Sequence, residues 1–505
     1  MSAGALVLGG VMAGLVLAAA ASHGKAETHH KQGISMYRLG RHAEAIEAFD
    51  RVIAIEPGRA DAHSCRGHAL RALGRHEEAL AAFEEAASLR PGDASVHSGR
   101  GRLLYTLKRH KEALAAFEEA VRLEEGNADA HSYRGYALRA LGRHEEALGA
   151  FERAAKFDPR DAGAHANVGH ALRALGRHEE ALAAFERAAK FDPRDAGAHA
   201  NVGHALRALG RHEEALAAFE RAAKFDPRDA GAHANVGHAL WELGRNDEAA
   251  AAFERSKQID PKNAYFHVSG GRALLALGRH AEALRSFEHA ASLSPDYYYA
   301  HYGRGTALLN LGLHEEALGA FERAGEIEPE CPEVHSSSGT ALLNLGLHEE
   351  ALGAFARALD LDSDDPYAHF GYGHALLGLG RGDEALKSLD RAADLEPDNA
   401  GIHLARGTAL IGMGRHEEAA ESLNCAIELD PHRVGAHASL GSTLLKLGRH
   451  AEALPVFERA IAQDRGNPSL HVGRGTALLN LGRHEEARGA LAKATDLDCA
   501  VAPVP

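Results

Sequence analysis

Apolar residues recur along this chain at the spacing of amphipathic α-helices, and the pattern repeats every 34 residues. In the stretch from Ala162 to Asp195, small or apolar residues stand three or four positions apart up to Leu175. A second series runs from Ala181 to Ala189. This spacing puts the apolar side chains on one face of a helix in each series. The stretch therefore predicts two helices, each with one buried face.

Local signals predict where these two helices begin and end. Gly176 ends the first helix, because glycine readily adopts the left-handed backbone that a short connection needs. Glu179 and Glu180 lie in the first turn of the second helix, where the helix dipole favours negative charge. Pro193 follows the second helix and cannot continue it. One repeat is thus a helix, a tight turn and a second helix.

Fourteen such repeats in register occupy residues 26–501, preceded by a segment of residues 1–25 and followed by a tail of residues 502–505. A period of this length indicates a solenoid, in which each repeat buries its apolar face on its neighbours. Only Lys108 replaces the turn glycine, which otherwise stands at Gly40, Gly74, Gly142, Gly176, Gly210, Gly244, Gly278, Gly312, Gly346, Gly380, Gly414, Gly448 and Gly482.

With Ala162 as position one of its repeat, position eight is Gly and position twenty is Ala in all fourteen repeats. Position twenty-four is Phe in eleven, with Leu389, Leu423 and Leu491 in the others. Small residues let two helices approach closely, and the ring fills the space behind them. This pattern resembles the tetratricopeptide repeat family. The resemblance implies an all-α, right-handed superhelical solenoid of about fourteen helix–turn–helix repeats that binds other proteins.

Histidine stands where that family usually has Trp and Tyr, at position four in all fourteen repeats and position seventeen in twelve. A zinc site needs three or four ligands about 2 Å from one ion, and the two columns lie at opposite ends of the helices. We interpret these histidines as flat, half-buried substitutes for the aromatic residues, and histidine-based metal or proton binding as a less favoured alternative. If they are buried and neutral, stability should fall below about pH 6.5.

The composition and the absence of known motifs disfavour several classes of function. The net charge of −15 disfavours a nucleic-acid-binding surface. Four widely spaced cysteines fit neither a disulfide framework nor a zinc ribbon. The sequence has no phosphate-binding loop, no nucleophile elbow and no segment outside the repeats long enough for a catalytic domain, so we expect neither catalysis nor a cofactor.

The N-terminal segment is uncharged from Ala3 to Ala21, which as a helix would approach the roughly 30 Å of a bilayer core. Basic residues follow it and none precedes it, so a membrane anchor would keep the repeats in the cytoplasm. Two alternatives stay open: a cleaved signal, which would make the protein secreted or periplasmic, and a mis-assigned start or non-functional leader on a soluble cytoplasmic protein.

The resemblance implies that ligands lie along the inner face of the first helices. Arginines stand there in the earlier repeats, and aromatic, leucine and asparagine side chains in the later ones. We therefore expect an extended partner segment with its apolar end on the tyrosines and an acidic end toward the arginines. The candidate partner-binding residues are Arg139, Arg173, Arg207, Tyr265, Tyr299, Tyr302, Leu309, Asn310, Leu343, Asn344, Tyr367 and Phe370.

These observations favour a non-enzymatic scaffold that binds a partner peptide or protein in this groove, with a possible membrane tether through residues 3–21. The alternative is a regulatory subunit that presents substrates to a separate enzyme such as a glycosyltransferase. The sequence does not identify the partner.

Overall fold

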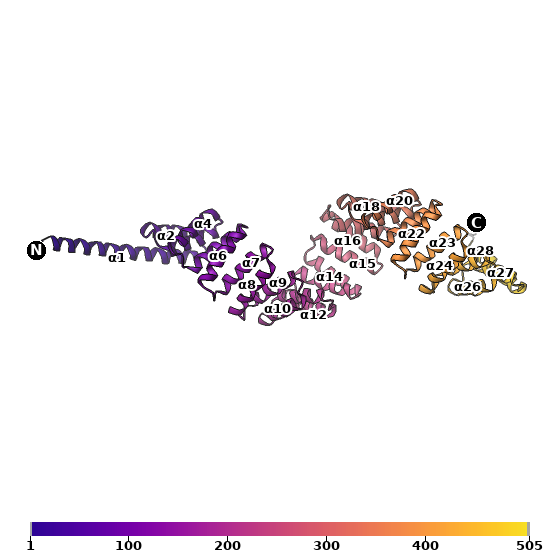
Figure 1. Cartoon of the computed structure of the whole chain (residues 1–505), viewed down its shortest axis with the longest axis horizontal. Helices are drawn as coiled ribbons and strands as arrows, with labels where there is room; N and C mark the ends of the chain where they lie inside the picture. The colour runs from indigo at the N-terminus through magenta and orange to yellow at the C-terminus, as the bar shows by residue number, and fades with distance from the viewer. Residues whose placement is uncertain (1–2, 502–505) are drawn as a thin grey trace. The chain divides into compact units, whose positions relative to one another are not determined.

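The computed structural model describes residues 3–501, with side chains described from residue 20 to residue 498. The chain divides into two compact units, residues 1–245 and 246–505, which we call the N-terminal and C-terminal units and describe separately. Between residues 3 and 501 the structure contains 28 helices and no strand. The prediction of an all-α chain of tandem helix pairs is confirmed. Figure 1 shows consecutive helices lying side by side within each unit.

In the N-terminal unit the first helices of the repeats are α1 (Ala3–Arg38), α3 (Ala60–Ala72), α5 (Ala94–Thr106), α7 (Ala128–Ala140), α9 (Ala162–Ala174), α11 (Ala196–Ala208) and α13 (Ala230–Glu242). The second helices are α2 (His42–Ile55), α4 (His76–Leu89), α6 (His110–Leu123), α8 (His144–Phe157), α10 (His178–Phe191) and α12 (His212–Phe225).

In the C-terminal unit the first helices are α15 (Ala264–Ala276), α17 (Tyr298–Asn310), α19 (Pro332–Asn344), α21 (Pro366–Gly378), α23 (Ala400–Gly412), α25 (Val434–Lys446) and α27 (Pro468–Asn480). The second helices are α14 (Asn246–Ile259), α16 (His280–Leu293), α18 (His314–Ile327), α20 (His348–Leu361), α22 (Gly382–Leu395), α24 (His416–Leu429), α26 (His450–Gln463) and α28 (His484–Val501).

The turn between the two helices of a repeat has the backbone that the sequence predicts. Gly176 has a φ of 73°, in the left-handed region, and the equivalent glycines have the same conformation. Lys108, the one substitution, adopts it as well, with a φ of 59°. The helix that follows begins with an ion pair, because the guanidinium of Arg177 donates to the carboxylate of Glu180. Glu180 therefore pairs with a neighbouring side chain as well as facing the helix dipole.

The core consists of small residues packed around one ring per repeat. Phe185 and its equivalents at position twenty-four are almost completely buried, as are the position-twenty alanines such as Ala181. Asp161 begins α9 by accepting a hydrogen bond from the backbone N–H of Gly163, which satisfies a donor that the helix start would leave free. An Asp or Asn side chain caps several other first helices in the same way, whereas α3, α17, α19 and α25 have no side-chain cap.

Helix α1 runs without interruption across residue 25, the predicted limit of the N-terminal segment. Among the residues that the structure describes, no helix is both long enough and apolar enough to cross a membrane. Side chains of residues 1–19 are not described, and residues 1–2 and the predicted tail of residues 502–505 lie outside the described part. The membrane anchor predicted for residues 3–21 draws no support from this finding and stays a prediction.

Candidate functional site

Three consecutive tyrosines, Tyr297, Tyr298 and Tyr299, begin helix α17, and Tyr302 lies one turn later. The Tyr298 ring stacks on Tyr302, with ring centroids 5.8 Å apart, and meets the edge of Tyr299 at 5.0 Å. Tyr299 keeps 52% of its surface exposed. The tyrosines therefore form one connected aromatic surface, part of which stays accessible.

Hydrogen bonds hold this surface in place. The hydroxyl of Tyr298 lies 2.9 Å from Sγ of Cys331, and the Cys331 thiol donates to Oε2 of Glu333 at 2.9 Å. Burial and the Cys331 contact raise the pKa of Tyr298, and burial, followed by the Glu333 contact, raises the pKa of Cys331. Both groups therefore stay protonated at neutral pH and can act as hydrogen-bond donors. Tyr298 is fixed, whereas Tyr299 has no such hydrogen bond in the described part of the chain.

A cavity of about 790 Å³ lies over Tyr297, Tyr298, Tyr299 and Tyr302. Residues of α15, α16, α17, α18 and the start of α19 line it, all within the C-terminal unit. A neighbouring cavity of about 410 Å³ shares Tyr302 with it and reaches Tyr367 at the start of α21. We call these two adjacent cavities, with their five tyrosines, the tyrosine groove.

The structure places only some of the predicted residues in this groove. Tyr299, Tyr302 and Tyr367 line it. Tyr265 is close enough to Tyr297 to help raise the pKa of that residue, although burial is the larger cause. Three of the predicted residues are thus brought together, and a fourth lies beside them.

The other predicted residues of the C-terminal unit lie elsewhere. Phe370 packs against a buried cluster around Leu389 and against the ring of His374, at 4.7 Å. Leu309 and Leu343 pack against buried clusters of their own repeats. Asn310 donates to the backbone oxygen of Thr306, and Asn344 is exposed. Contact between these residues and a partner stays a prediction.

Sequence reasoning missed Tyr297, Tyr298 and the carboxylates around the groove. These carboxylates belong to Asp296, Glu328, Glu330, Glu333, Asp362, Asp364 and Asp365. All lie in the turns between repeats or in the first turn of a helix. An acidic residue at the same position of successive turns is the signal that could have revealed them.

The predicted arginines lie in the N-terminal unit, and position nine of their three repeats holds Tyr136, His170 and His204. Burial lowers the pKa of His170 to about 4, with further contributions from Arg173 and from Arg139 one repeat earlier. His204 has a pKa of about 4 for the same reasons, with Arg207 and Arg173 as its neighbours. Arg139, Arg173 and Arg207 lie on the consecutive first helices α7, α9 and α11, and their role in binding a partner stays a prediction.

The position-four histidines hold the turns between repeats. Nε2 of His165 donates to the backbone oxygen of Pro159, 3.0 Å away, and its ring stacks on Phe191. Equivalent hydrogen bonds, at 2.8–3.3 Å, recur in every later repeat. These contacts support the interpretation of histidine as a flat, half-buried substitute for an aromatic residue. Among the described residues, no three His, Cys, Asp or Glu side chains are placed to share a metal ion.

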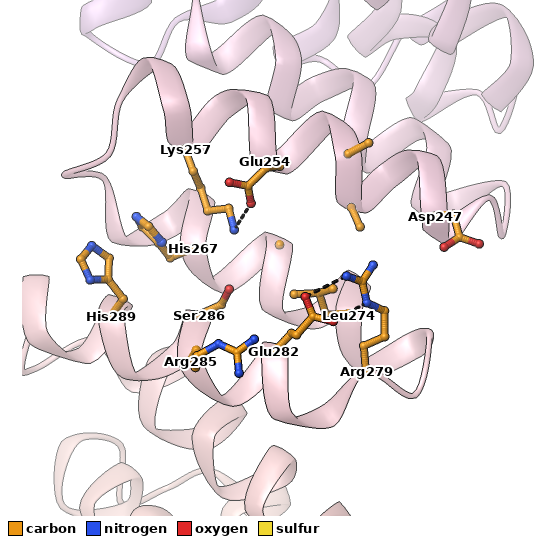
Figure 2. Close-up of a pocket in the computed structure, with 13 residues that line it drawn as sticks. Asp247, Glu254, Lys257, His267, Leu274, Arg279, Glu282, Arg285, Ser286 and His289 are labelled. Carbon is orange, nitrogen blue, oxygen red and sulfur yellow. Dashed lines mark hydrogen bonds and ion pairs between the residues drawn. The ribbon is translucent and has the colours of Figure 1, made fainter.

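A separate cavity of about 430 Å³ lies between α14, α15 and α16, as Figure 2 shows. Lys257 donates to Glu254 at 2.6 Å, and Arg279 pairs with Glu282 at 2.7 Å. With Arg285 and Asp247 added, its lining holds three lysine or arginine side chains and three carboxylates. Its charges balance, so this cavity favours neither an anionic nor a cationic ligand.

Comparison with known families gives a consistent result along the chain. Models described as tetratricopeptide repeat or TPR repeat match residues 30–94, 66–130, 98–162, 169–206, 203–244, 230–263, 274–338, 337–400, 370–434, 404–468 and 438–500. No curated protein sequence matches the chain.

Three solved structures illustrate the structural similarity. The Cut9–Hcn1 hetero-tetramer of the APC/C is 14% identical over 90% of this chain and 96% of that chain, with a TM-score of 0.48. Yeast Tom70 is 16% identical, and the match covers 85% of this chain and 96% of Tom70, with a TM-score of 0.38. YrrB, a TPR protein with an unusual peptide-binding site, is 26% identical. The match covers 37% of this chain and 96% of YrrB, with a TM-score of 0.31.

Proposed function

The chain belongs to the tetratricopeptide repeat family, and we propose that it is a non-enzymatic scaffold that binds an extended segment of a partner protein in the tyrosine groove. The observation that carries this proposal is the 790 Å³ cavity over Tyr297, Tyr298, Tyr299 and Tyr302. Aromatic side chains that stay partly exposed in a preformed cavity supply contact area at little conformational cost. The hydrogen bond between the Tyr298 hydroxyl and Cys331 fixes one of these rings in the cavity wall.

Selection of a random peptide library displayed on phage, with the full-length protein as bait, tests the proposal. We expect enriched peptides that lose at least tenfold in affinity for the Y299A/Y302A variant, about 1.4 kcal/mol or more. The single variant Y299A removes only an exposed side chain and guards against a folding defect. The variant Y37A/Y105A, which removes two tyrosines from the N-terminal unit, is the matched control.

Peptides that bind the wild type and Y299A/Y302A equally, or no enrichment at all, would refute the proposal. A regulatory subunit that presents substrates to a separate enzyme would use the same groove. No described residue favours that alternative over a simple scaffold.

A further inference from the structure

One position in the turns between repeats changes the sign of its charge along the chain. At position thirty-three, directly after the proline or serine of the turn in each of these eight repeats, four consecutive repeats carry Arg160, Arg194, Arg228 and Lys262. The next four carry Asp296, Glu330, Asp364 and Asp398. Four acidic residues in succession at one structural position create a continuous negative edge in the C-terminal unit.

This edge borders the tyrosine groove. Asp296 and Glu330 line the larger cavity, and Asp364 lines the smaller one. Seven carboxylates in all line the two cavities, whereas Arg272 is the one lysine or arginine among the described lining residues. The groove therefore carries a strong excess of negative charge.

Part of this negative charge is compensated within the protein, and part is not. Asp296 pairs with Arg323 at 2.8 Å, and Asp364 pairs with Arg391 at 2.6 Å. The side chains of Glu328 and Glu330, by contrast, are exposed and have no ion pair or hydrogen bond in the described part of the chain. These two carboxylates are free to pair with charges on a partner.

Tyrosine faces beside free carboxylates suit guanidinium and ammonium groups, which stack on aromatic rings and pair with carboxylates. The protein forms the aromatic part of such a contact elsewhere, because the Arg102 guanidinium lies 4.0 Å over the Tyr133 ring. Arg102 and Tyr133 belong to the neighbouring first helices α5 and α7. A tyrosine on a first helix of this protein can therefore hold a guanidinium over its ring.

We propose that the tyrosine groove is specific for a basic segment of a partner protein, in which arginine or lysine alternates with apolar side chains. The cationic groups lie over Tyr299 and Tyr302 and pair with Glu328 and Glu330, and the apolar side chains enter the larger cavity. The inference rests on the proposed function. The acidic end of the partner that we expect from the sequence would then contact only the arginines of the N-terminal unit.

Fluorescence anisotropy with the full-length protein tests this specificity. The probes are three fluorescein-labelled dodecapeptides that alternate leucine with arginine, with glutamine or with glutamate. We expect the arginine peptide to bind at least tenfold more tightly than the glutamine peptide, more weakly at high salt, and the glutamate peptide not to bind. The E328Q/E330Q variant should lower the affinity for the arginine peptide about tenfold.

A control of equal charge change is E315Q/E349Q, at exposed positions in the first turns of α18 and α20. We expect it to bind the arginine peptide like the wild type. Equal loss in both variants would mean general attraction to an acidic protein and would overturn the inference.

The remaining outcomes separate this inference from the proposed function. Binding of the glutamine or glutamate peptide as tight as that of the arginine peptide, and lost in Y299A/Y302A, would overturn the basic specificity and leave the peptide-binding function intact. Binding of the arginine peptide that survives Y299A/Y302A would refute both.

Discussion

Gly169 faces the ring of Phe185 so closely that a Cβ atom added to the glycine would lie 2.5 Å from Cε1 of the ring. Real Cβ atoms do not approach other atoms to this distance. The same pair recurs as Gly135 and Phe151, also at 2.5 Å. In the repeat where Leu389 replaces the phenylalanine, a Cβ on Gly373 would lie 2.8 Å from Cγ of the leucine. Close contact between the two helices of a repeat therefore explains why position eight is always glycine.

The substitution G169A is accordingly expected to lower the free energy of unfolding by about 1–3 kcal/mol, because the added methyl group overpacks a filled core. Alanine is otherwise the better helix former, by about 1 kcal/mol, so steric overlap has to outweigh that gain. Chemical denaturation followed by circular dichroism measures the difference.

The matched control is G149A in helix α8, where nothing lies within 4 Å of an added Cβ atom. This substitution should raise the free energy of unfolding by about 0.5–1 kcal/mol, since only the helix propensity changes. A stabilisation of similar size in both variants would contradict the packing explanation.

Buried histidines predict that the protein loses stability in weak acid. His68, His170 and His204 have pKa values of about 4, mainly because burial disfavours the charged ring. In the unfolded chain the pKa of a histidine is about 6.5. Above pH 6.5 these imidazole rings are neutral in both the folded and the unfolded chain, so the pKa difference does not change the stability. As the pH falls from about 6.5 to about 4, the unfolded chain binds protons that the folded chain does not, so stability falls.

A triple variant isolates this effect from the carboxylates that also titrate in acid. H68T, H170T and H204T introduce the threonine that position nine has in other repeats, at Thr306 and Thr340. We expect the melting temperature of this variant to depend less steeply on pH between 6.5 and 4 than that of the wild type. Parallel melting curves for the two proteins would show that these histidines are not responsible.

The fold could be predicted from the sequence because its determinants are local and repeated. Gly176 predicts its own left-handed turn, and the φ of 73° confirms it. For the position-four histidines, local sequence signals predict only part of what the structure shows. Their half-buried, aromatic-like role was predicted, whereas the bond from His165 to the Pro159 carbonyl depends on a turn whose path no single residue specifies.

The tyrosine groove was predictable only in part. Tyr299 and Tyr302 were found because they interrupt the repeat at positions on the inner face. Phe370 has the same position as Tyr302 and, like Tyr302, packs against a buried cluster, but of the two only Tyr302 lines the groove. Their shared position in the repeat therefore could not tell the two residues apart. Tyr298 was missed because its role depends on Cys331, 33 residues away.

The hydrogen bond of His165 predicts a measurable contribution to stability. H165F keeps a flat ring beside Phe191 but removes the donor to the Pro159 oxygen, so we expect the free energy of unfolding to fall by about 0.5–1.5 kcal/mol. His29 is the natural control, because in the described structure it forms no such bond. H29F should change stability by less than about 0.5 kcal/mol. Equal effects at both positions would assign the loss to ring packing instead.

We expect substitutions of Gly270, which lines the cavity of Figure 2, to stabilise the protein. Other repeats have arginine at this position seven, and Arg66 and Arg406 pair there with Asp50 and Asp390 of the preceding repeat, at 2.6 Å. A Cβ on Gly270 would meet only ordinary contacts, at 3.4 Å or more. G270A should therefore raise the free energy of unfolding by about 1 kcal/mol through helix propensity.

G270R should add a few tenths of a kcal/mol to that gain, because the new guanidinium can reach Glu254, which lies at the position of Asp50. The extra stability of G270R over G270A should disappear when E254Q is added to both, which a double-mutant cycle measures directly. If the arginine variant were less stable than the alanine variant, the cavity would be too small for the side chain. The ion pairs of the other repeats would then depend on a wider separation of helices than α14, α15 and α16 provide.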